Sequence, residues 1–285
     1  MDVWPIGVFA SIDAGLGVHL DVARELGVPT IQLHAPSPAA RTPEKARAFL
    51  DRLAAANLRL TAVFGGFDGE SYADIPTVAQ TVGLVPPETR AARFAEMVEI
   101  ADFARLLDCN VVGLHVGFVP HDTADPVYKE VVEITRRLCQ HCAGNGQSLH
   151  LETGQEPADC LLRFIEDTGC SNLFINFDPA NMILYGSGEP IAALEKVGRY
   201  VRSVHCKDAT PAARPGEEWG AEVPLGAGAV GMENYLRTLY KIGYRGPLTI
   251  EREIPQEPAR QKSEIGGAVR LLEQLRAKIL ADYAS

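Results

Sequence analysis

The sequence predicts a single (β/α)₈ barrel over residues 1–285, and three observations point to this fold class. Eight short apolar runs rich in β-branched residues recur along the chain. Between them lie segments with the 3.6-residue apolar period of amphipathic helices. No segment has the composition of a linker between domains. The length also suits such an α/β barrel, which takes about 250 residues before loop insertions.

The expected strands alternate with helices from one end of the chain to the other. They cover Trp4–Ser11, Thr30–Ala35, Arg59–Gly65, Asn110–Val116, Ser148–Thr153, Leu173–Asp178, Arg202–Lys207 and Pro247–Glu253. A doubly wound sheet is the main rival, but it usually has fewer strands and a phosphate-binding turn after the first one. Residues 11–17 lack a full glycine fingerprint, which favours the barrel.

The helices are expected from their periodicity and from the residues at their ends. Residues 90–108 place apolar side chains mostly on one stripe, and residues 269–280 give a second example. Thr42 is expected to cap a helix that begins at Pro43. Turn-forming residues precede four of the strands: Gly27, Asn57, Gly146 and Gly243.

Composition excludes several classes of function. The chain has 37 acidic and 27 basic residues and a net charge of −10, which disfavours nucleic acid as a partner. No apolar run is long enough to span a membrane, and residues 1–2 open no signal segment, so we expect a cytoplasmic protein. Six cysteines are too few for a disulfide scaffold, and the pair Cys139 and Cys142 is expected to be buried in a helix.

Four consecutive strands end on residues that can bind a metal ion: Glu152, Asp178, His205 and Glu251. In a barrel of this type the catalytic groups lie at the C-terminal ends of the strands. Two positions earlier on each strand stand polar residues, His150, Asn176, Ser203 and Thr249, whereas their neighbours Leu151, Phe177, Val204 and Ile250 are apolar. The two-residue period of a strand therefore predicts that the four candidate ligands converge inside the barrel mouth.

Three carboxylates and one imidazole suit a hard or borderline divalent cation, because the carboxylates would otherwise repel one another. We expect one ion, Mn²⁺ in the first place, with Mg²⁺, Co²⁺ or Zn²⁺ as alternatives. Glu152 and Glu251 come from opposite sides of the mouth. One could remove a proton from a carbon beside a carbonyl, and the other could return it, through an enediolate that the metal stabilises. This chemistry describes a ketose epimerase or an aldose–ketose isomerase.

The second half of the chain resembles the xylose isomerase-like TIM barrel superfamily. This group includes tagatose 3-epimerase, hydroxypyruvate isomerase, inosose dehydratase and endonuclease IV. The resemblance covers residues 147–253 and is carried by four segments: Leu151-Glu152-Thr153, Phe177-Asp178-Pro179-Ala180-Asn181, Val204-His205-Cys206-Lys207-Asp208 and Tyr244-Arg245-Gly246-Pro247-Leu248-Thr249-Ile250-Glu251. It implies that Glu152, Asp178, His205 and Glu251 are the metal ligands, with both glutamates catalytic.

The same resemblance implies a carbohydrate substrate and a homo-oligomer, either a dimer or a tetramer. His115 matches a position near the substrate, and His34 is a further candidate. Asn181 stands where the epimerases often have a histidine that contacts the substrate, so the substrate could differ from a simple free ketohexose. Lys207 shares the inward parity of His205 and could contact the substrate or pair with Asp208 or Glu253.

Three alternatives to an epimerase or isomerase remain open. A lyase or dehydratase acting on a keto-sugar or keto-inositol would use the same enediolate and expel a leaving group. An endonuclease IV-like repair enzyme is the second alternative. By resemblance it would use three zinc ions, and that mechanism needs more histidines than this chain offers. A non-catalytic sugar-binding barrel would need no acid/base pair.

Further segments carry weaker predictions. Residues 226–231 spell G-x-G-x-x-G without the preceding strand that a nucleotide site needs, although their amides could bind an anion. Residues 211–228 are expected to form a long active-site loop in which Trp219 and Arg214 could cover a sugar. Glu156 is expected to open a helix, and residues 65–86 are expected to form a loop that could act as a lid.

Overall fold

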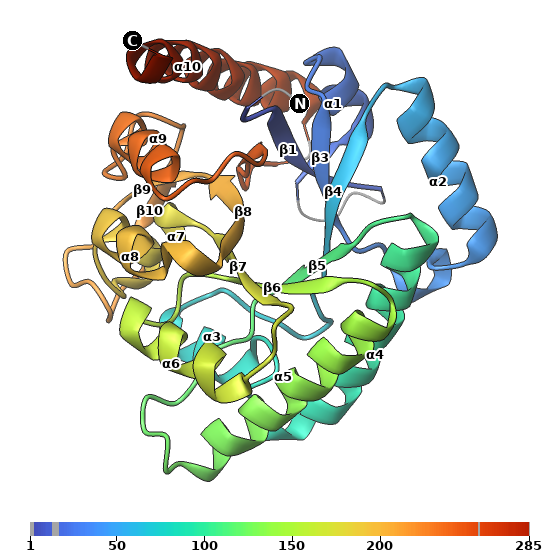
Figure 1. The fold of residues 1–285 in the computed structure, drawn as a ribbon, viewed down its shortest axis with the longest axis vertical. Coiled ribbons are helices and arrows are strands. Elements are labelled where there is room, and N and C mark those ends of the chain that lie inside the picture. Colours follow the sequence, from blue (N-terminus) through green and yellow to red (C-terminus); the bar gives the residue numbers. More distant parts are fainter. Residues whose placement is uncertain (1–2, 13–16, 256, 285) are drawn as a thin grey trace.

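The protein, seen in a computed structural model that describes residues 3–12, 17–255 and 257–284, is a closed parallel barrel surrounded by helices (Figure 1). Around the barrel the strands follow the chain order: β1 (Ile6–Ser11), β3 (Thr30–His34), β4 (Arg59–Phe64), β5 (Val111–Leu114), β6 (Ser148–Glu152), β7 (Leu173–Phe177), β8 (Val201–Cys206) and β11 (Leu248–Ile250). Parallel pairing of Ile6 with Leu248 closes the ring between β1 and β11. The predicted fold class, a single (β/α)₈ TIM barrel, is confirmed.

All eight predicted strands are present, with differences at their ends. The first strand begins two residues later than predicted, because Trp4 takes a left-handed backbone conformation (φ 57°) outside the sheet. The last strand is shorter than predicted, so Glu251 follows β11 rather than lying within it. A two-residue strand, β2 (Val18–His19), pairs with the end of β1. Of the segments used above, residues 1–2 and 13–16 lie outside the described residues.

The helices cover the outside of the barrel. They are α1 (Leu20–Glu25), α2 (Pro43–Ala55), α3 (Ile75–Thr81), α4 (Pro87–Leu106), α5 (Pro126–Gly144), α6 (Ala158–Thr168), α7 (Pro179–Tyr185), α8 (Pro190–Val197), α9 (Met232–Lys241) and α10 (Pro258–Ala284), with short 3₁₀ turns at Pro38–Ala40 and Gly198–Tyr200. Thr42 caps α2 as predicted, by accepting a hydrogen bond from the Lys45 amide. Gly27, Asn57, Gly146 and Gly243 all have positive φ, which explains why these residues end the preceding segments.

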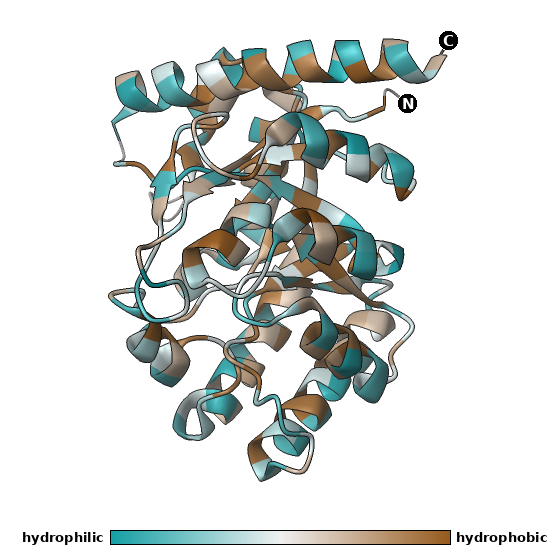
Figure 2. Ribbon diagram, turned by 90° about the vertical axis from the view of Figure 1, so that its left-hand side faces the viewer, coloured by the Kyte–Doolittle hydropathy of each residue, from teal (hydrophilic) through white to brown (hydrophobic). Residues whose placement is uncertain are grey.

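The core lies between the barrel and its helices. Leu151, Phe177, Val204 and Ile250 are buried in one large apolar cluster with helix residues, as the strand parity predicts. Figure 2 shows hydrophilic and hydrophobic residues alternating along α10, which is longer than the stretch of residues 269–280 picked out by periodicity. Among the described residues, no helix combines the length and the apolar character that crossing a membrane requires.

Polar side chains fill part of the barrel interior. His150 on β6 bonds through Nδ1 to Ser203 Oγ on β8 at 2.7 Å, although β7 lies between these two strands. Gln32 on β3 donates to Asn176 on β7 at 3.3 Å. Such bonds between strands that are not neighbours can form only inside the barrel. The predicted polar parity of the strands is therefore the inward one.

The two long segments expected to be loops contain regular structure. Residues 65–86 include α3, and residues 211–228 include one strand of a hairpin made by β9 (Asp208–Thr210) and β10 (Ala221–Val223). Both segments border the C-terminal ends of the barrel strands, where Trp219, Glu222 and Tyr72 line a pocket. Their position at the mouth agrees with the prediction, but their secondary structure was missed.

Candidate metal centre and pocket

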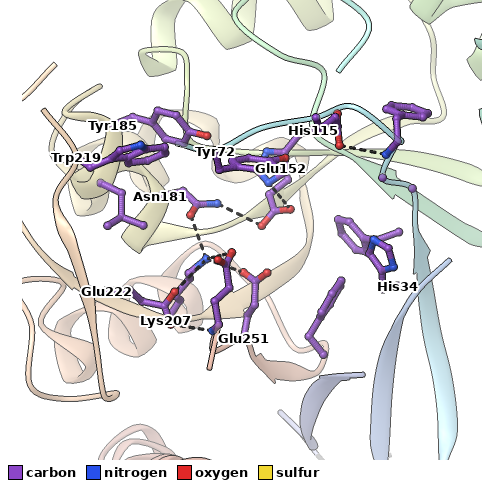
Figure 3. Close-up of a pocket in the computed structure, with 18 of the residues that line it drawn as sticks. His34, Tyr72, His115, Glu152, Asn181, Tyr185, Lys207, Trp219, Glu222 and Glu251 are labelled. Atoms are coloured by element: carbon purple, nitrogen blue, oxygen red, sulfur yellow. Dashed lines mark hydrogen bonds and ion pairs between the residues drawn. The ribbon is translucent and has the colours of Figure 1, made fainter. Parts of the chain in front are cut away.

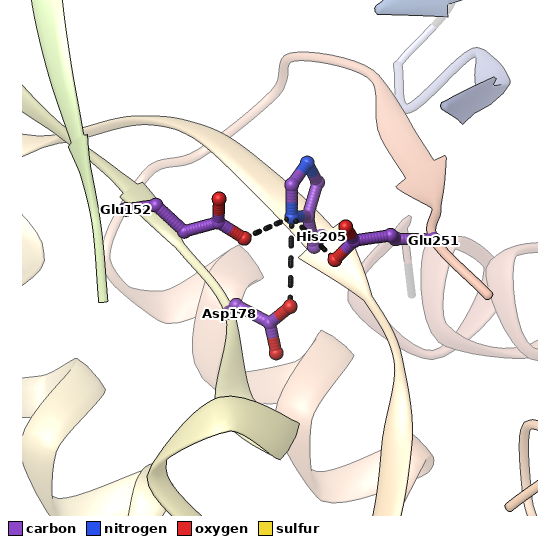
Figure 4. Close-up of side chains that lie close together, drawn as sticks. All are labelled: Glu152, Asp178, His205 and Glu251. Carbon is purple, nitrogen blue, oxygen red and sulfur yellow. Dashed lines mark hydrogen bonds and ion pairs between the residues drawn. The ribbon is translucent and has the colours of Figure 1, made fainter. Parts of the chain in front are cut away.

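Glu152, Asp178, His205 and Glu251 meet at the C-terminal end of the barrel (Figure 4). Each offers one ligand atom, and these four atoms lie within 4.8 Å of one another. All four residues are buried, and Glu251 is the most exposed at 8%. Glu152 and His205 lie near the ends of β6 and β8, whereas Asp178 and Glu251 immediately follow β7 and β11. The structure thus brings together the four side chains that the strand pattern had predicted to converge.

His205 lies at the centre of this cluster. Its Nδ1 atom is 2.7 Å from Glu152 Oε1 and 3.1 Å from Glu251 Oε2. The same atom is 3.5 Å from Asp178 Oδ2. Figure 4 shows the two glutamates reaching this nitrogen from opposite sides. One nitrogen and three carboxylate oxygens therefore surround a common point.

Asp178 shows that the cluster fits a cation. Its Oδ1 atom accepts hydrogen bonds from the amides of Ala180 and Asn181 and so caps α7. Its Oδ2 atom is buried and has no hydrogen-bond partner among the residues that the structure describes. A buried carboxylate oxygen without a partner is costly unless a positive charge lies next to it. The donor set of three carboxylates and one imidazole suits a divalent ion of the Mg²⁺, Mn²⁺ or Zn²⁺ type.

The charges in the cluster shift the pKa of its members. Burial alone would lower the pKa of His205, but Glu152 and Glu251 outweigh it and raise that pKa well above its usual range. Burial also opposes ionisation of Glu152, yet His115 and His205 lower its pKa to about 2. The pKa of Asp178 is raised by burial. Burial also opposes ionisation of Glu251, but Lys207 and His205 outweigh it and lower the pKa of Glu251 well below its usual range. The two glutamates are thus stronger acids than Asp178, and they face one shared imidazole.

His115, which follows β5, holds the second oxygen of Glu152. Its Nε2 atom lies 3.0 Å from Glu152 Oε2. On its other side, the side-chain nitrogen of Gln155 lies 3.4 Å from His115 Nδ1 and donates to the Tyr185 hydroxyl at 3.2 Å. Burial disfavours the charged imidazole, but Glu152 raises the pKa of His115 to about 9. His115 therefore contacts the candidate ligand Glu152, and its role near the substrate stays a prediction.

Lys207, predicted to point over the mouth, is buried beside Glu251. Its Nζ atom lies 3.3 Å from Glu251 Oε2, 3.5 Å from Glu253 Oε1 and 3.8 Å from Glu222 Oε2. The expected pair with Glu253 is therefore present, and Lys207 also donates to Asn181 Oδ1 at 3.4 Å. Burial would lower the pKa of this ammonium, but the surrounding carboxylates raise it well above its usual range.

Glu152 and Glu251 open onto a pocket with a cavity volume of about 530 Å³ (Figure 3). Its walls are aromatic and acidic, and one wall is formed by Tyr185 packed against Trp219 with ring centroids 4.5 Å apart. Figure 3 shows His34 on one side of the pocket and Trp219 on the other. All four predicted substrate-contacting residues line it: His34, His115, Asn181 and Lys207.

Several residues of the pocket and of the metal centre were assigned no role from the sequence. Glu222 lies on β10, within a Pro- and Gly-rich segment that has no strand periodicity. Glu70 lines the pocket and also accepts hydrogen bonds from the amides of Phe67 and Gly83. Gln32 Oε1 lies 2.7 Å from His205 Nε2, the ring nitrogen that faces away from the carboxylates. The only indication in the sequence was that Gln32 occupies an inward-facing position of the strand β3.

Three weaker predictions are wrong. The amides of the G-x-G-x-x-G segment are not open to an anion, because Asp208 accepts from Gly226, Gly228 and Val230. Glu156 does not cap α6, whose N-cap residue is Pro157; it accepts from the Val119 amide instead. Arg214 is exposed and pairs with Glu217 and Glu218 rather than covering the pocket with Trp219.

Cys139 and Cys142, by contrast, are free and buried in α5 as predicted.

The fold and this cluster define a TIM barrel with a candidate site for one divalent metal ion. The chain belongs to the xylose isomerase-like TIM barrel family, whose model matches residues 20–275. A comparison with curated protein sequences gave no match.

Solved structures share the whole fold. A xylose isomerase domain protein from Planctomyces limnophilus is 62% identical, with a TM-score of 0.96 over 98% of this chain and 99% of that chain. A xylose isomerase-like TIM barrel protein from Mycobacterium smegmatis, in complex with magnesium, is 20% identical (TM-score 0.70; 97% and 98% covered). An L-ribulose 3-epimerase is 18% identical (TM-score 0.70; 100% and 98% covered). The last two show a common fold alone.

Proposed function

We propose that the protein is a divalent-metal-dependent sugar epimerase or isomerase in which Glu152 and Glu251 form the acid/base pair. The observation that carries this proposal is the approach of two buried glutamates to one imidazole nitrogen from opposite sides, at the edge of an open pocket. Family membership supports an enzyme acting on carbohydrates. The fold shared with an L-ribulose 3-epimerase is consistent with this reaction class.

The proposed metal ligands are Glu152, Asp178, His205 and Glu251. When bound, the metal would polarise the substrate carbonyl and stabilise the negative charge of an enediolate. We favour Mn²⁺, because the ligand set mixes three hard oxygens with one borderline nitrogen. The magnesium complex of the mycobacterial relative makes Mg²⁺ the first alternative.

The remaining residues would orient the two glutamates and the substrate. His115 binds Glu152 Oε2, and Lys207 binds Glu251 Oε2, so each carboxylate is held by one basic side chain. One glutamate would remove a proton from the carbon beside the carbonyl, and the other would deliver a proton to the opposite face. Asn181, which contacts both Glu152 and Lys207, would bind a substrate hydroxyl.

Isotope exchange tests this proposal. Incubating the metal-loaded protein with candidate ketoses in D₂O should place deuterium at the carbon next to the carbonyl and yield the epimer or the aldose. Glu152→Gln and Glu251→Gln should each lower the exchange rate at least about 100-fold, the size of effect typical for a general acid or base. Glu156→Gln replaces a buried glutamate that does not line the pocket and should retain the wild-type rate.

The products distinguish the alternatives. Exchange with loss of water or another leaving group would favour a lyase or dehydratase, which shares the first proton transfer. Full exchange in both glutamine variants would reject the acid/base pair. We further propose that the protein is cytoplasmic and forms a homo-oligomer. Sedimentation of the purified protein would measure its oligomeric state.

A further inference from the structure

Gln32 connects the candidate metal centre to the opposite side of the barrel. It lies on β3, is 2% exposed and contacts residues from two other strands. Its Oε1 atom lies 2.7 Å from His205 Nε2, and its Nε2 atom donates to Asn176 Oδ1 at 3.3 Å. It does not line the pocket. Its effect on the site must therefore act through His205.

The side-chain amides of Asn176 and Gln32 orient each other. Asn176 is fully buried and presents its carbonyl oxygen to Gln32. With Asn176 in this orientation, the Gln32 amide nitrogen points toward that oxygen, because reversing Gln32 alone would place two acceptors side by side. Consequently the carbonyl oxygen of Gln32 faces the imidazole, and this oxygen can only accept a hydrogen bond.

This acceptor decides where His205 carries its proton. A neutral imidazole has one N–H group and one lone pair, and Gln32 Oε1 requires the N–H on Nε2. When a cation takes the place of the Nδ1 proton among the three carboxylates, the N–H on Nε2 remains, and the lone pair on Nδ1 faces the cation. The rings of Phe9 and Phe64, with centroids 5.6 Å and 5.5 Å from that of His205, hold the imidazole plane without offering a competing acceptor.

We infer that Gln32 is a positioning residue that keeps the proton of His205 on Nε2 and so presents Nδ1 to a divalent cation. This inference rests on the metal site of the proposed function. Ligating histidines typically donate their second ring N–H to a neighbouring acceptor, and loss of that acceptor lowers metal affinity by about 10- to 100-fold. The carbonyl of Gln32, whose amide nitrogen bonds to Asn176, supplies that acceptor here.

Two substitutions at Gln32 separate this role from simple packing. Gln32→Leu keeps the approximate volume and removes the acceptor. Gln32→Glu keeps an acceptor toward His205, and Asn176 can turn its unpaired Nδ2 group toward the new carboxylate. Gln147→Leu is the matched control, because Gln147 is also a buried glutamine but its side chain donates to the backbone carbonyls of Ala101 and Cys109, away from the candidate site.

Two measurements on the full chain test whether Gln32 positions His205 for metal binding. Titration calorimetry with Mn²⁺ and with Mg²⁺ should show about 10- to 100-fold weaker binding for Gln32→Leu, with Gln32→Glu and Gln147→Leu within about threefold of wild type. Nitrogen-15 spectra of histidine-labelled protein should show a solvent-protected proton on Nε2 of His205 in the wild type and its loss in Gln32→Leu.

The spectra also separate this inference from the proposed function. A wild-type His205 without a proton on Nε2 would overturn the role of Gln32, and so would wild-type metal affinity in a folded Gln32→Leu protein. A wild-type protein that binds neither ion, while Nε2 keeps a proton that Gln32→Leu loses, would reject the metal centre and still support the positioning of His205 by Gln32. Equal losses of affinity in Gln32→Leu and Gln147→Leu would reduce Gln32 to a packing residue.

Discussion

Asp178 divides its two carboxylate oxygens between the fold and the candidate site. One oxygen caps α7 through the amides of Ala180 and Asn181, and the other accepts no hydrogen bond from a described residue and lies 3.5 Å from His205 Nδ1 among the potential ligands. Because the cap holds the carboxylate in place, the free oxygen needs no further support to stay in position. A single side chain thereby links the start of a helix to the chemistry at the barrel mouth.

Glu156 illustrates a buried carboxylate that the candidate site does not use. It is 4% exposed, and burial raises its pKa to about 7, above the ordinary glutamate value of 4.5. Since the folded state favours the protonated form, its contribution to stability is fully present below pH 4.5 and is lost as the pH rises through 7.

Glu156→Gln should remove this pH-dependent loss, because the amide stays neutral and can still accept from the Val119 amide. The variant should gain up to about 3 kcal/mol of unfolding free energy relative to wild type between pH 4.5 and pH 8. Urea denaturation of both proteins at pH 5, 6, 7 and 8 measures this difference in unfolding free energy. The contributions of the other titrating groups cancel, because both proteins share them. A constant difference across the range would contradict the raised pKa.

The candidate ligands could be predicted from the sequence because each lies at a strand end with a polar residue two positions earlier. That pattern identifies inward parity for one strand at a time. It says nothing about pairs such as Gln32 and His205, which meet only because the barrel curves β3 toward β8. Glu222 was missed for another reason, since its strand is only three residues long and is formed by pairing with β9.

At the scale of elements, close backbone contacts fix the segment of residues 65–86 at the barrel mouth. Gly83 in the segment of residues 65–86 lies against the backbone of Val116 and Gly117, and the Leu84 amide donates to the Val116 carbonyl at 2.8 Å. Glu70 bonds to the amides of Phe67 and Gly83 and closes the segment on itself. These contacts argue that the segment expected to be a lid is instead a fixed wall that positions Tyr72.

Substitution of two glycines in this segment tests that interpretation. Gly69 and Gly83 both have positive φ, of 83° and 74°, so alanine should cost about 1 kcal/mol at either position from backbone strain. At Gly69 the added methyl group meets nothing within 4 Å, whereas at Gly83 it would overlap with the Val116 carbonyl. Gly83→Ala should therefore lose about 1–3 kcal/mol more than Gly69→Ala. Equal losses in urea denaturation would show that the segment moves freely.

At the scale of the whole molecule, closure of the barrel creates the candidate site. Its four potential ligands come from β6, β7, β8 and β11 or the residues that follow them, which lie side by side around the ring but span residues 152–251 of the chain. The alternation of strands and helices was enough to predict this closure. The unfolded chain cannot hold these four groups together, so a bound cation should stabilise only the folded barrel.

A divalent ion should therefore raise the melting temperature of the whole protein. At a free concentration of 100 times its Kd, an ion that binds only the folded state adds about 2.7 kcal/mol to the unfolding free energy. Asp178→Asn is the matched control, because asparagine can still cap α7 through its side-chain oxygen but replaces the unpaired oxygen with an uncharged amide. Calorimetric melts with Mn²⁺, with Mg²⁺ and after chelation should show a metal-dependent shift in the wild type that Asp178→Asn largely loses. An equal shift in both proteins would place the stabilising ion elsewhere, and no shift in either would argue against a metal at this mouth.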